Sequence, residues 1–363
     1  MSQRISIGNM KFCLIVPQEF YQHYHQSPFE ISGLLNWARV LDGEIRMINH
    51  PDIDQFDTIM TNVSSTESEY ISVIRQVNPD AKIIACFDYG FDVVNQYFTN
   101  MDRVKQVMER ADIVFSVNRN QVEWMKVLLP EKIIHYVPHP TDIANVMKFR
   151  RERKDRETGH IAAMWHQYDN YQVQSLEVLK AVERKLKRSL RKVLIGLKPR
   201  FMLEHGITVA AAGIPIINEQ YPDESLRGKP LDPDLPQIVS RAPPGVSWDT
   251  VLPYLGVDGW YSNLSRFEAA LDLYTTNSVG RFGMDCAGVG IPLVASDRQD
   301  SSKLLWPFTT VDPFVPLPAV TFVSKLLNNA EFYERVERMA LKNLGHYGFA
   351  ASRERMMKVL EAR

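Results

Sequence analysis

Residues 271–297 constrain the fold of this chain more than any other part of its sequence. They begin with an apolar run of strand length, which ends in the small polar cluster at residues 275–278, a good helix N-cap. From Val279 to Val289 apolar residues recur at steps of three or four, so they share one helical face. Gly290 and Pro292 stop the helix, and a short apolar strand follows. The segment therefore predicts a strand–helix–strand unit.

The start of this helix has the features of a phosphate-binding site. Unpaired backbone N–H groups at Ser278 and Gly280, together with the positive end of the helix dipole, favour a phosphate. Arg281 adds a fork of donors, and about one turn further on Asp285 could accept hydrogen bonds from ribose hydroxyls. The alternative is a solvated Arg281–Asp285 ion pair at i, i+4 spacing, worth about 0.3–0.5 kcal/mol.

The same segment resembles the donor-binding motif of GT-B-fold glycosyltransferases, especially the large retaining family with many bacterial polysaccharide and lipid glycosyltransferases. That motif runs Glu, seven residues, Glu, then a helix of small residues and Gly-x-Pro. Residues 290–292 match the ending, Asp285 falls at the second Glu, the ribose ligand, and Asn277 falls at the first. The resemblance implies a nucleotide role for Asp285 and a catalytic, sugar-contacting position at Asn277, in a motif that diverges at both Glu positions.

Strand and helix patterns alternate along the first half of the chain, which predicts a parallel, doubly wound sheet. The expected strands are residues 11–17, 44–48, 56–61, 81–87, 112–116 and 132–137. Helical spacing is found at residues 30–41, 66–76, 101–110 and 120–128.

A charge-rich boundary at residues 138–159 leads into a second region of the same kind. It has expected strands at 160–165, 191–196 and 207–211, helices at 173–190, 248–255 and 264–270, a long loop at 226–244 and a final helix at 332–360. The expected fold is α/β, with two Rossmann-like doubly wound domains facing a cleft. The resemblance adds a C-terminal helix that crosses back to the first domain. We expect an acceptor domain at 1–145, a donor domain at 146–345 and the returning helix at 346–363.

Doubly wound domains bind ligands at the carboxyl ends of their strands, so the residues after each strand are the catalytic candidates. Asp88 follows the strand at 81–87 and could take a proton from an acceptor hydroxyl if the transfer inverts; alternatively, it caps the next turn. His25 lies in the loop after the first strand and can accept a proton at neutral pH, although such loop histidines are usually surface residues.

On the donor side, His166 follows the first strand of the second domain, where the family usually places an Arg and a Lys against the diphosphate. Lys198 follows the next strand and is the available replacement, because a leaving diphosphate needs positive charge. A solvated loop cation is the alternative for such a residue.

The absence of certain motifs and apolar runs argues against several other classes of protein. There is no GxGxxG after the first strand, which disfavours a dinucleotide-dependent dehydrogenase, and no metal-binding spacing, so we expect metal-independent transfer with no cofactor beyond the donor. No apolar run approaches the roughly 20 residues of a membrane span, and the polar start is not a secretory signal, so we expect a cytoplasmic protein.

The sequence therefore predicts a glycosyltransferase that uses a UDP- or GDP-linked sugar, a hexosyl- or pentosyltransferase. A glycan or lipid-linked saccharide is the default acceptor, from the resemblance. The basic runs at 148–156 and 184–192 motivate an alternative acceptor, a hydroxymethylated base in DNA. A third hypothesis is a binding or scaffolding protein that keeps the fold without turnover.

Overall fold

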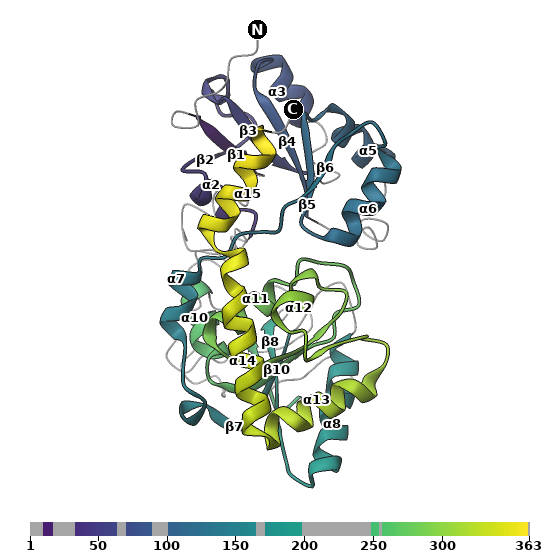
Figure 1. The fold of residues 1–363 in the computed structure, drawn as a ribbon. Helices are drawn as coiled ribbons and strands as arrows, with labels where there is room; N and C mark the ends of the chain where they lie inside the picture. The colour runs from purple at the N-terminus through teal and green to yellow at the C-terminus, as the bar shows by residue number, and fades with distance from the viewer. Residues whose placement is uncertain are drawn as a thin grey trace, which may run out of the picture. The chain divides into compact units, whose positions relative to one another are not determined.

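The computed structural model describes residues 10–16, 33–63, 70–88, 101–164, 171–197, 248–253 and 256–361 (Figure 1). The chain divides into two compact units. The first comprises Met1–Asp142, Asn277–Val279 and His346–Arg363, and the second comprises Ile143–Thr276 and Gly280–Gly345. Each unit contains one six-stranded parallel sheet, so the prediction of two doubly wound α/β units is confirmed.

The sheet of the first unit has the strand order β2-β1-β3-β4-β5-β6. The strands are β1 (Phe12–Ile15), β2 (Glu44–Arg46), β3 (Thr58–Asn62), β4 (Lys82–Phe87), β5 (Ile113–Ser116) and β6 (Ile134–Tyr136). The helices include α2 (Asn36–Val40), α3 (Tyr70–Val77), α5 (Met101–Arg110) and α6 (Arg119–Leu128). Each of the six predicted strands overlaps one of these. Their apolar runs are continuous because β1, β3 and β5 are buried along their whole length, as in a parallel sheet covered on both faces.

The end of the chain completes the first unit. The helix predicted at 332–360 is in fact two helices, α14 (Ala330–Leu344) and α15 (Phe349–Glu361), separated by the 3-10 turn η8 (Gly345–Tyr347). The backbone N–H of Thr141 donates to the carbonyl of Tyr347 (2.7 Å). On α15, the guanidinium of Arg353 donates to the carbonyl of Val40 (3.0 Å). The predicted return of the C-terminal helix to the first unit is confirmed.

The sheet of the second unit has the order β12-β11-β10-β7-β8-β9. Its strands are β7 (Glu157–Met164), β8 (Arg191–Leu197), β9 (Thr250–Pro253), β10 (Phe267–Asp272), β11 (Leu293–Ser296) and β12 (Thr310–Val311). Its helices include α7 (Ile143–Val146), α8 (Tyr171–Leu186), α10 (Gly256–Leu264), α11 (Arg281–Val289), α12 (Asp300–Leu305) and α13 (Pro316–Asn328).

Two helices predicted in this unit are wrong. Residues 248–255 contain β9, and residues 264–270 contain most of β10, with α10 between the two strands. All of β10 is buried, so its sequence does not alternate between apolar and polar residues. Its Ala and Glu residues are also typical of helices, which is why the pattern was interpreted as a helix. The strand predicted at 207–211 and the loop predicted at 226–244 lie outside the described residues.

In each sheet there is one point at which the chain stops adding strands on one side of its first strand and continues on the other side. In the first unit the chain places β2 and β3 on opposite sides of β1. In the second unit it places β8 and β10 on opposite sides of β7. Ligands of such folds bind outside the carboxyl ends of the strands at this reversal. The segment that follows β10 therefore begins at the expected ligand-binding edge. No helix in the described part of the chain is long and apolar enough to cross a membrane.

Candidate active site

The loop after β10 ends in a glycine that fixes where α11 begins. Gly280 has φ +77°, in the left-handed region, and occupies the N-cap position without a side-chain cap. A Cβ atom on Gly280 would lie 2.4 Å from Oγ of Ser301, which donates a hydrogen bond to the carbonyl of Gly280 (2.7 Å). The predicted helix start at Ser278 is wrong, because the left-handed residue interrupts the helical path and α11 starts at Arg281.

Asn277 and Ser278 precede this glycine in a short segment whose contacts place it with the first unit. The side-chain amide of Asn118, the N-cap of α6, donates to the carbonyl of Ser278 (2.9 Å). Asn277 and Ser278 are both partly buried. The predicted sugar contact of Asn277 and the predicted phosphate contact of Ser278 stay predictions.

Asp285 lies on the second turn of α11 and is 1% exposed. One carboxylate oxygen accepts from the indole Nε1 of Trp260 (3.1 Å), and the other accepts from the hydroxyl of Tyr261 (3.4 Å) and from Nε of Arg281 (3.2 Å). The Arg281–Asp285 pair therefore exists at i, i+4 spacing, but it is not the solvated pair of the alternative interpretation. Trp260 and Tyr261 come from α10, which the sequence did not predict. The ribose contact of Asp285 stays a prediction.

Burial sets the electrostatics of this cluster. It raises the pKa of the Asp285 carboxyl, while Arg281 and the donors of Trp260 and Tyr261 act in the opposite direction. Burial also works against the charge of Arg281, yet Asp285 and Tyr261 raise the pKa of that guanidinium above its usual value. Arg281 is thus a cation held firmly at the start of α11, where a phosphate would meet both its charge and the helix dipole.

The carboxyl ends of β10 and β11 are joined by a buried polar network. Gln299, which follows β11 and is 1% exposed, donates from Nε2 to Oδ2 of Asp272, the last residue of β10 (2.6 Å). The hydroxyl of Ser302 donates to Oε1 of Gln299 (3.3 Å). Sequence reasoning missed these residues, although an Asp that ends an apolar strand was a usable signal. The network fixes the strand ends from which the loop to Gly280 departs.

In the first unit, Asp88 directly follows β4 and contacts a histidine. Its Oδ1 lies 2.6 Å from Nε2 of His139, which is 3% exposed. Nδ1 of His139 is buried and has no hydrogen-bond partner in the part of the chain that the structure describes. Because a buried, unpartnered N–H would be costly, Nε2 is the ring nitrogen placed to donate to Asp88. Sequence reasoning did not single out His139.

Three predicted site residues, His25, His166 and Lys198, lie outside the described residues. Within those that are described, no group of three or more His, Cys, Asp or Glu residues is placed to hold a metal ion.

The basic run at 148–156 is largely paired inside the second unit. Arg150 forms an ion pair with Glu337 (2.7 Å), and Arg153 forms one with Glu268 (3.0 Å). The fully buried guanidinium of Arg156 donates to the hydroxyl of Tyr333. These three arginines hold the segment against β10 and α14 and are engaged within the second unit, whereas Arg151 and Lys154 of the same run are exposed.

No family model matches the sequence, and no curated protein sequence is significantly similar to it. Solved structures do match. An α-glucosyltransferase in complex with UDP and a 13-mer DNA containing a HMU base has a TM-score of 0.60 and 12% identity, and the match covers 98% of this chain and 100% of that one. An α-glucosyltransferase in complex with UDP-glucose and DNA containing an abasic site has a TM-score of 0.56 and 13% identity, and the match covers 97% of this chain and 100% of that one. Trehalose-6-phosphate synthase, OtsA, has a TM-score of 0.60 and 10% identity, and the match covers 84% of this chain and 72% of that one.

These likenesses define the class of fold. The two doubly wound units and the returning C-terminal helix match the GT-B fold of these solved structures. The α-glucosyltransferase is matched over nearly the whole length of both chains, whereas the match leaves out about a quarter of the trehalose-6-phosphate synthase.

Proposed function

We propose that this protein is a glycosyltransferase that transfers a sugar from a nucleotide-sugar donor to an acceptor hydroxyl. The observation that carries the proposal is the position of Gly280 and Arg281. They begin a helix at the carboxyl end of β10, beside the reversal of strand order, where doubly wound sheets bind nucleotides. The fold match to enzymes with UDP or UDP-glucose bound supports the same reading and favours a uridine donor.

In this proposal the second unit holds the donor. Arg281 and the amino end of α11 stabilise the diphosphate as it leaves, because negative charge accumulates there in the transition state. Asp285 orders Arg281 through the ion pair between them. In the first unit, Asp88, oriented by His139, is the group that accepts the proton of the attacking hydroxyl. The proposal includes no cofactor beyond the donor.

The test is binding and turnover with a panel of UDP- and GDP-linked sugars. Calorimetry gives the affinity for each nucleoside diphosphate, and release of the nucleoside diphosphate reports hydrolysis or transfer. We expect UDP to bind and at least one UDP-sugar to be turned over. Absence of binding by every nucleotide would refute the proposal, and binding without any turnover would favour the scaffolding hypothesis.

Transfer to a hydroxymethylated base in DNA is the second candidate function. It is favoured by the near-complete, end-to-end match to an α-glucosyltransferase in complex with DNA, and not by the basic run at 148–156, in which Arg150 and Arg153 are already paired. Radiolabelled donor sugar should enter duplex DNA that contains the modified base and not the matched unmodified duplex. If neither duplex is labelled and a glycan acceptor is labelled instead, the DNA acceptor is refuted and a glycan acceptor is supported.

A further inference from the structure

Basic residues gather in the first unit where β5 and β6 end. Arg119, the first residue of α6, has its guanidinium carbon 4.6 Å from the ring centroid of Tyr136, the last residue of β6. On α15, Nη2 of Arg355 donates to the carbonyl of His346 (2.9 Å) and lies 3.3 Å from the ring Nε2 of that histidine. Burial lowers the pKa of His346, and the charges of Arg355 and Arg119 lower it further. The cluster of Arg119, Arg355 and His346 is hereafter the basic cluster.

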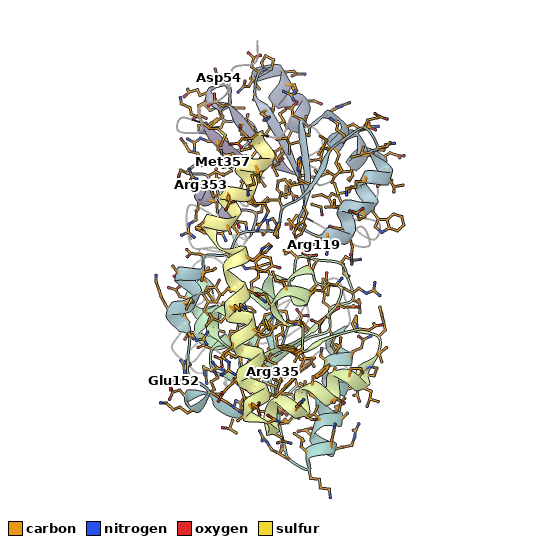
Figure 2. The ribbon with its side chains drawn as sticks, viewed as in Figure 1. Asp54, Arg119, Glu152, Arg335, Arg353 and Met357 are labelled. Carbon is orange, nitrogen blue, oxygen red and sulfur yellow. The ribbon has the colours of Figure 1, made fainter. Side chains whose placement is uncertain are left out.

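Arg355 differs from its neighbour on the same helix. Arg353, marked on α15 in Figure 2, forms an ion pair with the exposed carboxylate of Asp42. Arg355 is partly buried, and across the described ranges no carboxylate lies within ion-pair distance of it. Glu354, its sequence neighbour, is paired with Lys358 (2.6 Å). Nη1 of Arg355 is buried and has no hydrogen-bond partner there.

A partly buried guanidinium without an acidic partner is an unusual arrangement. Proteins normally pair buried charges, because desolvation of an uncompensated ion is unfavourable. Burial is also the main reason that the pKa of Arg355 lies below its usual value, and the charge of Arg119 contributes. Among the described residues, Arg355 is therefore a cation of the basic cluster that lacks an anionic partner. The cations and not the helix end define the cluster, because the side chain of Asn118 already accepts from the N–H groups of Asn120 and Gln121.

We infer that the basic cluster binds a phosphate group of the acceptor substrate. Guanidinium forks suit the oxygens of a phosphate, and the nearby amino end of α6 adds a favourable dipole. The cluster lies in the same unit as Asp88 and at the same edge of its sheet, the carboxyl ends of the strands, whereas the proposed donor residues Arg281 and Asp285 lie in the second unit. The inference rests on the proposed transferase function and adds to it the substrate class: an acceptor that carries a phosphomonoester or a phosphodiester.

The test compares Arg355→Gln with Arg353→Gln, which removes the same charge from the same helix. Binding of inorganic phosphate, of a hexose 6-phosphate and of a short DNA duplex with a hydroxymethylated base is measured at one fixed ionic strength. We expect Arg355→Gln to weaken binding of at least one phosphate probe by about tenfold or more, as for loss of a charged hydrogen bond. Arg353→Gln should change it by less than about twofold, as for an exposed charge. The probe that responds identifies the phosphomonoester or the phosphodiester as the source.

The affinity for UDP is measured on the same variants and should not change, which separates this inference from the donor site. Equal weakening by both substitutions, or no binding of any phosphate probe by the wild type, would overturn the inference. Loss of UDP affinity in Arg355→Gln would overturn it too, since the cluster would then serve the donor. If Arg355→Gln does not fold, Arg119→Gln takes its place with the same expectations. Failure of the proposed function itself is recognised separately, by a wild-type protein that binds no nucleotide.

Discussion

Arg281 and Arg355 are both withdrawn from solvent, yet their surroundings shift their pKa values in opposite directions. Burial works against the charge of Arg281, but Asp285, 3.2 Å away, and Tyr261 together outweigh it, so the pKa of Arg281 is raised. Arg355 meets a carbonyl and an imidazole, and burial lowers its pKa. The comparison teaches that the second unit completes its charge pair internally, while the first unit leaves a cation to be neutralised from outside.

The comparison is sharpened most by removing the carboxylate. Asp285→Ala leaves Arg281 buried without a counter-ion and removes the acceptor of Trp260 and Tyr261. We expect the free energy of unfolding to fall by about 3–5 kcal/mol, measured by urea denaturation. Asp258→Ala, at an exposed position in the first turn of α10, is the control and should lose less than about 1 kcal/mol. Wild-type stability of Asp285→Ala would show that the pair contributes nothing to the fold.

The position of Arg281 depends on the glycine before it. Gly280→Ala forces a side chain into the left-handed region and against Ser301, so we expect a loss of about 1–3 kcal/mol in the same measurement. Gly345→Ala is the matched control: its Cβ would enter open space at φ −53°, and the change should be neutral or stabilising by up to about 1 kcal/mol. Similar behaviour of the two variants would contradict the role assigned to Gly280.

Replacing Arg355, the arginine of the first unit in this comparison, should change the stability less than replacing Asp285. Arg355→Gln removes one hydrogen bond to His346 and no ion pair, so the loss of stability should be about 0.5–1.5 kcal/mol in the absence of ligand. Thermal or urea unfolding of the variant without added phosphate measures it. A loss as large as that of Asp285→Ala would mean that Arg355 already has an acidic partner.

The smallest effect is a dependence of stability on pH through His346. Its pKa in the folded protein is lowered, chiefly by burial, below the value of about 6.5 expected for the unfolded chain. The folded state then binds fewer protons than the unfolded state, so this contribution is complete above that pH and is lost as the pH falls through the lower, folded-state pKa. His346→Gln should show a shallower loss of stability between neutral and mildly acidic pH than the wild type. Parallel pH profiles of the two proteins would refute the assignment.

The parts of the fold that the sequence predicted well are those with strong local patterns. In the first unit, short apolar strands alternate with helices whose apolar residues recur at helical spacing, and both kinds of element were located. The errors fell at β9 and β10, and at β10 the burial of every residue removes the alternation that distinguishes a strand. Glu268, the second residue of β10, is tolerated there because Arg153 and the backbone N–H of Gly159 donate to its carboxylate, contacts that only the folded chain reveals.

The candidate site was predictable in its chemistry but not in its surroundings. The spacing of Arg281 and Asp285 indicated a pair on one helix, and the pair is present. Its burial by Trp260 and Tyr261 depends on α10, which local sequence did not predict. His139 and Arg355 lie far in sequence from Asp88 and Arg119, so no local pattern could associate them.

The return of the chain to the first unit has a consequence for how the protein is made. The ammonium of Lys82 on β4 donates to the carbonyl of Leu360 (2.5 Å), and Thr141 is bridged to Gly348. During translation β1 to β6 are synthesised first, whereas α15, which contacts the first unit, is synthesised only after every strand of the second unit. The nascent first unit therefore lacks the packing of α15 until residues 349–361 have been translated.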